Sequence, residues 1–319
     1  MQRVLERYLL LWLVGLSLVA FYWTVWFGEA PSPFVASKPY LPALIAVTMF
    51  AIGWMLPQEE VRQVFVRWPT VLSGTTLQYI AMPMLAYLVG HACGFTGDLL
   101  IGVIMVGCVP GAMASNVLTL ISRGNTSYSV SLTTTATLLS PLVVPVTLKL
   151  ALSSQESVDH WFLLRTSLLL LAIVVLPVVF GHLLSRRFPN YSITAGKVGS
   201  VVANLSILWI IAVVVGLNHQ RLHNLEALLL FALLAINIGG YCVGYFGGTA
   251  LRLNEPMRRA LTLEIGMQNA GLGATLATQL FAGRDETAIA PALYTFGCML
   301  TGTILARIWA GRRLEVVRG

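Results

Sequence analysis

The sequence predicts an all-α protein that crosses a membrane many times, and three observations support this. First, 57% of the 319 residues are hydrophobic and only 10% are charged, whereas a soluble domain carries about 25% charged residues. Second, apolar runs of about 18–25 residues recur along the whole chain, each long enough to span a hydrocarbon core of about 30 Å. Third, glycine and polar residues interrupt two of these runs, as in the broken helices of transporters.

We expect ten membrane spans and no separate soluble domain, because no linker is long enough to hold one. In chain order, the expected spans cover residues 9–27, 41–56, 70–90, 99–122, 127–151, 162–185, 198–217, 225–250, 257–282 and 288–310. The first span has the basic start of a signal peptide. However, the aromatic stretch Phe21–Phe27 stands where a cleavage site needs small residues, so we expect a retained span with an interfacial aromatic belt. The short second span can be extended by Pro39 and Tyr40.

The basic residues are divided unequally between the two sides of the membrane. Ten spans place both termini on one side, and that side carries 15 of the 20 lysine and arginine residues. These are Arg3, Arg7, Arg62, Arg67, Arg123, Arg186, Arg187, Lys197, Arg252, Arg258, Arg259, Arg307, Arg312, Arg313 and Arg318, whereas the other side has Lys38, Lys149, Arg165, Arg221 and Arg284. The positive-inside rule then places both termini in the cytoplasm, and a bacterial source would make this the inner membrane. Topology explains the net charge of +7, so we exclude a nucleic-acid partner.

The ten spans divide into two halves of five that share one pattern. In each half a long basic loop follows the second span, at Gln58–Pro69 and at Ser185–Gly199. The fourth span of each half is then interrupted, at Gly107–Asn116 and at Glu264–Gly273. Because five is an odd number, the second half must be inverted relative to the first. Interrupted spans at corresponding positions of inverted halves indicate a secondary-transporter site at the membrane midplane.

The composition of the first interruption explains how such a site could bind ions. Pro110 lacks an amide hydrogen and Gly111 is flexible, so a helix can break there. Freed carbonyls at one half-helix end can coordinate sodium, and amides at the start of the other can hold an anion. The alternative is an ordinary proline kink packed by small residues, which we disfavour because two matched spans are interrupted.

Glu264 is the only acidic residue that lies well inside an apolar segment. An ionisable group at that depth costs about 2.5–3.5 kcal/mol on insertion scales, so it marks an ion or substrate site by default. The alternative is a neutral, hydrogen-bonded structural Glu. We disfavour it because the neighbouring Gln268 and Asn269 are also polar.

Hydroxyl groups crowd the first half of the fifth span, where Ser129 and Thr133 lie on one helix face. With carbonyls and a carboxylate they form hard oxygen ligands, which suit a group 1 or group 2 cation and not zinc. Other hydroxyls can bond back to the preceding turn, and we favour this for Ser131 and Thr135. Gln78 in the third span either bridges two helices or offers one oxygen ligand.

Several other functional classes lack their motifs in this sequence. The four cysteines form no CxxC pair, the five histidines lie near expected span ends, and none belongs to HExxH. The chain contains neither a nucleophile elbow nor a P-loop. We therefore expect no enzyme, no transition metal, no cofactor and no obligatory protein partner.

Three stretches of the chain carry a distinctive set of motifs, which read PGAMASNVLTLISRGN at 110–125, SVSLTTTATLLSP at 129–141 and EIGMQNAGLGATLA at 264–277. In these stretches the chain resembles the bile acid:sodium symporter family. The third is the most specific, because a GMQNxGL core preceded by Glu is characteristic of the family. The resemblance covers the whole chain and implies two domains, with spans 4 and 9 as a broken pair that cross. The panel domain would be spans 1, 2, 6 and 7 (about 9–56 and 162–217), and the core domain spans 3–5 and 8–10 (about 70–151 and 225–310).

The resemblance also implies two sodium sites, and every side chain that they require is present. The first site would be held by Ser115, Asn116, Ser129, Thr133 and Glu264. The second would be held by Gln78, Glu264 and Gln268, with the backbone carbonyls of Ile265 and Met267. Sodium ions are thus the implied coupling ions.

The substrate side departs from the family pattern. Members commonly have P-G-G-T where this chain has Pro110–Met113, so a thioether replaces a hydroxyl, and Gly297–Met299 is less polar than in bile-acid-binding bacterial relatives. Asn269, which faces the substrate cavity in the family, is kept. The implied substrate residues are Gly111, Ala112, Met113, Asn269, Cys298 and Met299. They indicate an organic anion, either bile-acid-like or a small acid such as pantoate or a keto acid.

We therefore expect a sodium-coupled secondary active symporter that imports an organic anion by alternating access. One alternative is a proton-coupled carrier in which Glu264 titrates. Another is a membrane receptor or scaffold that binds without transporting.

Overall fold

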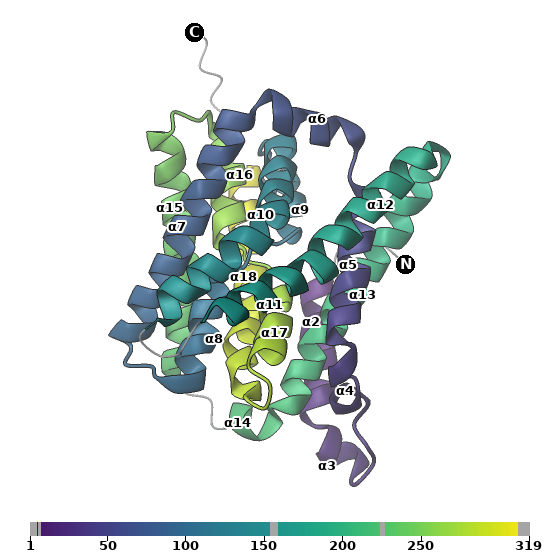
Figure 1. Ribbon diagram of the computed structural model, residues 1–319, viewed down its shortest axis with the longest axis vertical. Coiled ribbons are helices and arrows are strands. Elements are labelled where there is room, and N and C mark those ends of the chain that lie inside the picture. Colours follow the sequence, from purple (N-terminus) through teal and green to yellow (C-terminus); the bar gives the residue numbers. More distant parts are fainter. Residues whose placement is uncertain (1–4, 6–7, 154–158, 224–226, 312–319) are drawn as a thin grey trace.

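The computed structural model describes residues 5, 8–153, 159–223 and 227–311, and their regular structure is helical with no strand (Figure 1). Six of the described helices are long and apolar enough to cross a membrane. They are Lys38–Met55, Thr126–Leu152, His160–Arg187, Thr194–Leu217, Ala227–Ala250 and Asp285–Gly311. Two shorter apolar helices cover Leu9–Phe21 and Gly97–Cys108. The prediction of an all-α, multi-pass membrane protein is confirmed.

One group of helices packs mostly around α5 and α13, on the right of Figure 1, and its helix α11 leads from this group to α10 near the centre. Its members are α2 (Leu9–Phe21), α3 (Trp23–Phe27), α4 (Pro33–Ala36), η1 (Lys38–Tyr40), α5 (Leu41–Met55), α11 (His160–Leu170), the π-turn η2 (Leu171–Val175), α12 (Leu176–Arg187), η3 (Pro189–Tyr191) and α13 (Ser192–Leu217). Helices α5 and α12 can approach closely because two glycines lie at their contact. A Cβ on Gly53 would overlap the backbone of Val178, and a Cβ on Gly181 would overlap the backbone of Phe50. This is the small-residue contact expected between membrane helices.

A second group of helices surrounds the two interrupted spans. It consists of α7 (Trp68–Ala92), α8 (Gly97–Cys108), α9 (Ala114–Ile121), α10 (Thr126–Leu152), α15 (Ala227–Ala250), α16 (Glu255–Gly266), α17 (Ala270–Leu280), η4 (Asp285–Ala288) and α18 (Ile289–Gly311). The amphipathic α6 (Gln58–Val66) precedes α7, and the short α14 (His219–His223) precedes α15. Helix α15 packs along α16 because Gly244 leaves room for the backbone of Thr262.

The two interruptions lie against each other. Helix α8 ends at Cys108 and α9 begins at Ala114, and α16 ends at Gly266 and α17 begins at Ala270. The Ala112 amide donates to the Met267 carbonyl at 2.7 Å, and the Asn269 amide donates to the Pro110 carbonyl at 2.8 Å. These bonds satisfy backbone groups that a broken helix leaves unpaired at membrane depth.

The structure differs from the expected boundaries in a few places. Helix α13 begins at Ser192, six residues before the expected start at 198, so much of the predicted second loop is helical. The first expected span is broken at Tyr22, between α2 and α3. The eighth expected span starts at 225, and residues 224–226 lie outside the described part, as do Arg3, Arg7, Arg312, Arg313 and Arg318.

Candidate functional site

Glu264 lies in the last turn of α16 and is fully buried. Its Oε2 accepts hydrogen bonds from Ser115 Oγ at 2.5 Å and from Thr133 Oγ1 at 2.7 Å. Its Oε1 is buried and has no hydrogen-bond partner among the residues that the structure describes. Helices α9, α10 and α16 therefore converge on one carboxylate, which keeps a free oxygen.

The remaining residues of the first predicted sodium site surround this contact. Thr133 Oγ1 lies 3.3 Å from Asn116 Oδ1 and 3.1 Å from the carbonyl of Ser129, one turn earlier in α10. The hydroxyl of Ser129 in turn accepts from Thr119 Oγ1 at 3.2 Å. Ser115 and Asn116 can reach α10 because the interruption places the first turn of α9 beside it. The structure brings all five predicted residues together.

The second predicted site centres on Gln268, inside the α16–α17 interruption. The side chain of Gln268 donates through Nε2 to the Ile265 carbonyl at 2.7 Å, and its Oε1 is buried without a partner. Gly111 forms an isolated β-bridge with Gln268, and a Cβ at Gly111 would overlap Glu264 Oε1. Gly111 thus lies between the unpaired oxygen of Glu264 and the backbone of Gln268. A side chain at that glycine would occupy the space beside the carboxylate.

Gln78 is almost fully buried in α7, and neither atom of its amide has a partner. Gly74 and Met82 precede and follow Gln78 by four residues, so the three share a helix face. A Cβ at Gly74 would meet Tyr128 and Leu132 of α10 and Leu261 of α16, and the Met82 sulfur lies against Gly240 of α15. Gln78 therefore lies on the face of α7 that turns towards α10, α15 and α16.

These unpaired atoms indicate a ligand. A buried polar group without a partner costs about 1–3 kcal/mol, so native proteins rarely leave one unpaired. Here Gln78, Glu264 and Gln268 each keep an unpaired buried oxygen. Carbonyls contribute too: the Ile265 oxygen accepts one bond and retains a second lone pair. The set is one carboxylate with neutral oxygens, which suits a hard cation of low charge.

The predicted substrate residues occupy two different environments. Met113 and Asn269 are half-buried where the interruptions meet; Asn116 Nδ2 lies 3.5 Å from the Met113 sulfur, and Asn269 Oδ1 accepts from the Leu272 amide at 3.1 Å. Cys298 is enclosed, 1% exposed, with its thiol 3.5 Å from the Thr295 carbonyl. Of the others, Gly111 is buried, and Ala112 and Met299 are half-buried.

Sequence reasoning missed a group of residues that hold the end of α16. The Gly266 carbonyl accepts from Asn237 Nδ2 at 2.7 Å and from the Tyr294 hydroxyl at 2.8 Å. Asn237 Oδ1 accepts from Thr301 Oγ1 at 2.7 Å, and that hydroxyl lies 3.1 Å from the Tyr241 hydroxyl. Asn237 could have been found, because it is a lone amide inside an apolar span, as Gln78 is.

The prediction for Thr135 is wrong. We expected its hydroxyl to bond back to the preceding turn, but Oγ1 is buried and has no partner. The nearby Thr133 does bond back to α10 and also reaches Glu264. The position of a residue on the helix therefore decides whether its hydroxyl donates a hydrogen bond to the preceding turn.

A surface hollow of about 350 Å³ lies between α11 and α17, apart from the site residues. It is lined by Trp161, Leu164, Arg165, Leu168, Leu169 and Gln279. None of the predicted sodium or substrate residues contributes to it.

Comparison with known proteins identifies the family. Residues 42–225 match the profile of the Sodium Bile acid symporter family, which is more than half of the chain. The chain belongs to this family. It is 31% identical over 281 residues to the uncharacterized sodium-dependent transporter YocS of Bacillus subtilis, covering 88% of this chain and 86% of YocS. These findings confirm the resemblance of the three motifs to the family.

More distant relatives of this symporter family come from plants and animals. The probable sodium/metabolite cotransporter BASS1 of Arabidopsis thaliana is 30% identical over 275 residues, covering 85% of this chain and 67% of BASS1. The ileal sodium/bile acid cotransporter of Mus musculus is 28% identical over 281 residues, covering 86% and 79%. The family consists of transporters and not of enzymes, which agrees with the expectation from the missing catalytic motifs.

Proposed function

We propose that this chain is a sodium-coupled symporter that imports an organic anion by alternating access. The observation that carries the proposal is the state of Glu264. Its carboxylate is fully buried, one oxygen is held by hydroxyls from two other helices, and the other oxygen is unpaired. A site with these features needs a cation to balance the buried charge.

Two sodium ions are assigned to this region. Ser115, Asn116, Ser129, Thr133 and Glu264 hold the first ion. Gln78, Glu264, Gln268 and the carbonyls of Ile265 and Met267 hold the second. The unpaired oxygens of Gln78, Glu264 and Gln268 support the second assignment, because they lack any protein donor. Glu264 is shared, so one carboxylate offsets part of the charge of both ions.

The helices are assigned to ten spans in two inverted repeats, with α8–α9 and α16–α17 as the broken spans. The α5 group forms the panel domain and the α7 group forms the core domain. The hydrogen bonds between the two interruptions support the crossing, because they join corresponding positions of the two halves.

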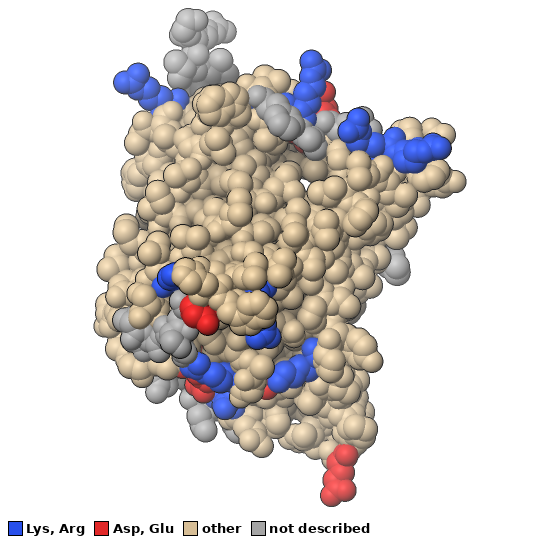
Figure 2. Space-filling view, viewed as in Figure 1, with Lys and Arg blue, Asp and Glu red and all other residues tan. Residues whose placement is uncertain are grey.

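We assign the cytoplasm to the end of the molecule that carries most of the arginine, in the inner membrane of a bacterial cell. At the opposite end, three of the five basic residues lie around η4. Lys38 pairs with Asp285 at 2.7 Å, Arg221 with Glu286 at 3.7 Å, and Arg284 lies beside η4. In the face shown in Figure 2, Lys and Arg side chains lie at the upper end and in the lower half from about mid-height down, with a band of uncharged residues between them. A charge-free band of this kind fits the lipid-facing part of a spanning protein.

The substrate is an organic anion bound where the interruptions meet, beside Gly111, Ala112, Met113 and Asn269. The start of α17 supports this, because the N-terminus of a helix attracts negative charge. Asn269 uses its oxygen to cap α17, which leaves its amide NH₂ available to a ligand. Two sodium ions moving with one monovalent anion carry a net positive charge inward, which contributes about 2.3 kcal/mol per 100 mV.

Proton coupling through Glu264 is the alternative, because the unpaired Oε1 could carry a proton instead of facing a cation. Uptake into proteoliposomes separates the two mechanisms. We expect uptake of radiolabelled organic anions to require an inward sodium gradient at constant pH. Uptake driven by a pH gradient without sodium would favour the proton carrier, and specific binding without any uptake into sealed vesicles would favour a receptor.

A thermal-shift screen identifies the substrate class. Purified protein is heated with bile acids, pantoate and keto acids, each with sodium chloride and with potassium chloride. We expect the substrate to raise the melting temperature only when sodium is present. A panel in which no organic anion has a sodium-dependent effect would contradict the proposed coupling.

A further inference from the structure

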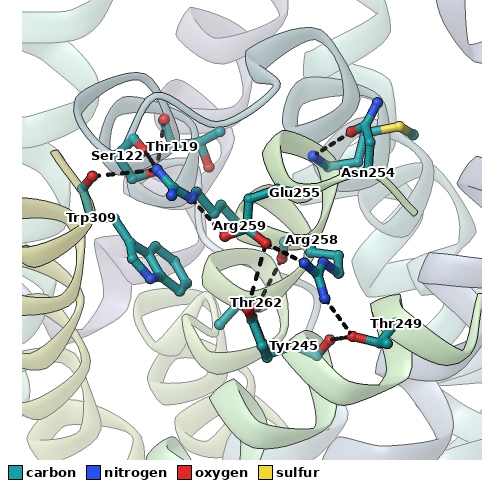
Figure 3. A network of polar contacts seen from close by, with 11 residues as sticks. Thr119, Ser122, Tyr245, Thr249, Asn254, Glu255, Arg258, Arg259, Thr262 and Trp309 are labelled. Carbon is teal, nitrogen blue, oxygen red and sulfur yellow. Dashed lines mark hydrogen bonds and ion pairs between the residues drawn. The ribbon is translucent and has the colours of Figure 1, made fainter. Parts of the chain in front are cut away.

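A buried arginine lies in the N-terminal half of α16, before the turn that carries Glu264. Arg259 is 3% exposed, although arginine is rarely buried without partners. Its Nη1 donates to the Ser122 carbonyl at 2.8 Å and to the Trp309 carbonyl at 3.3 Å, and its Nε donates to Glu255 at 3.0 Å (Figure 3). Its guanidinium also lies 5.6 Å from the centre of the Trp309 ring. Arg259 thus joins α16 to two other segments, one after α9 and one in α18.

The contact with Ser122 concerns the sodium site, because Ser122 caps the C-terminus of α9. Helix α9 has only eight residues, from Ala114 to Ile121, and its second residue is Ser115. At its start, Ser115 donates to Glu264 of α16, and at its end the Ser122 carbonyl accepts from Arg259 of the same helix. Helix α16 therefore holds α9 at both ends.

The turn after α9 is fixed by the same helix start. The Asn125 amide donates to the Pro256 carbonyl at 2.8 Å, and the Gly124 amide donates back to Thr119 at 2.8 Å. A Cβ at Gly124 would press on Thr119 and Pro256, so this turn fits closely against α16. A helix of two turns has little rigidity of its own, since most helical stability comes from tertiary contacts. Its position therefore depends on tertiary contacts, and those with α16 hold its two ends while α10 and α18 pack along it.

We propose that Arg259 is a positioning residue for sodium binding, an inference that rests on the proposed function. It fixes the C-terminal end of α9, and through α9 it fixes Ser115 and Asn116 relative to Glu264. Supports behind the direct ligands of a metal typically change its affinity about 10–100-fold when they are removed. Arg259 supports one ligand-bearing helix and touches no proposed ligand itself.

The neighbouring Arg258 provides a matched control. It also pairs with Glu255, at 2.5 Å, and it lies over the Tyr245 ring and donates to Thr249 (Figure 3). None of these contacts reaches α9. Arg258→Gln removes one charge from the same network and leaves the Ser122 contact in place.

Equilibrium binding of radiolabelled sodium to purified protein tests the proposal without transport. We expect Arg259→Gln to raise the half-saturating sodium concentration about tenfold, Arg259→Lys to raise it less, and Arg258→Gln to leave it unchanged. Unchanged binding in Arg259→Gln would overturn the inference. If that variant does not fold, the Lys variant decides in the same way. Absence of sodium binding by the wild type would refute the proposed function instead.

A double-mutant cycle separates positioning from general destabilisation. Ser115→Ala removes the ligand that α9 presents to Glu264, so adding Arg259→Gln should then raise the half-saturating concentration by clearly less than about tenfold, because one of the two positioned ligands is gone and only Asn116 remains on α9. In the Gln78→Ala background, where the missing ligand lies on α7, the full tenfold factor should remain. Equal factors in both backgrounds would mean that Arg259 does not act through α9.

Discussion

Replacing Glu264 with Gln should abolish sodium binding while the protein stays folded. The substitution keeps the size of the side chain and can keep an oxygen facing Ser115 and Thr133, which donate to Oε2. It removes the negative charge that faces the proposed cations. At about 4 Å and an effective dielectric constant of about 20, that charge contributes about 4 kcal/mol to each ion. A loss of this size weakens sodium binding roughly a thousandfold.

The free energy of unfolding without sodium should change in the opposite direction. An unpaired carboxylate oxygen in a fully buried site carries a desolvation cost, and the neutral amide lowers it. We therefore expect the melting temperature of Glu264→Gln in potassium chloride to equal or exceed that of the wild type. In sodium chloride the wild type should gain stability, and the variant should gain none.

The control for this experiment is Glu286→Gln, the same chemical change at a half-exposed residue that pairs with Arg221. It should keep the full sodium-dependent gain in melting temperature. A wild-type gain in Glu264→Gln would refute the assignment of the carboxylate to the cations. If both variants lost the sodium-dependent gain in melting temperature, the net charge of the protein, and not the site, would control that gain.

Substitutions at four other positions test separate parts of the site. Thr133→Ala and Gln78→Ala should each weaken the sodium dependence of uptake, and the Hill slope should change because the two residues belong to different proposed sites. Identical shifts of the half-saturating sodium concentration with an unaltered Hill slope would contradict the presence of two sites. Asn269→Ser keeps an oxygen that can accept from the Leu272 amide and cap α17, so this variant should keep its stability and bind substrate more weakly. Asn269→Ala should bind substrate more weakly and also lose about 1 kcal/mol of stability. Equal substrate affinity in the wild type and both variants would assign Asn269 to capping alone. Met113→Thr introduces a hydroxyl donor and should change the rank order of anions in competition assays, and an unaltered order would leave Met113 as a packing residue.

The helical part of the fold was predictable because the signal is repeated along the whole chain. Apolar runs of membrane length need no knowledge of tertiary contacts, and the structure has helices in each expected range. The start of α13 at Ser192 was not predictable in this way. Its first turns carry Lys197 and Ser192, so hydropathy alone does not separate them from a polar loop.

The site was predictable where one residue departs from its apolar surroundings. Glu264, Gln78 and the two glycine-containing interruptions stand out in this way. Of the two side chains that donate to the Gly266 carbonyl, Asn237 also stands out, whereas Tyr294 does not, because it has an ordinary place in an apolar helix and acts through one hydroxyl. The unpaired Thr135 shows the same limit, since its sequence neighbourhood is nearly that of Thr133. Which hydroxyl faces another helix depends on how the helices pack, and this cannot be derived from a single sequence.

The hydrogen bonds between the two interruptions give a physical reason for coupling. Ala112 and Asn269, which flank the proposed substrate site, bond through their backbones to Met267 and Pro110. Met267 also supplies a proposed sodium ligand through the same carbonyl. A cation that draws on this oxygen therefore changes the position or polarisation of the Ala112 amide beside the substrate. Binding coupling is reciprocal, so substrate must raise sodium affinity by the factor by which sodium raises substrate affinity.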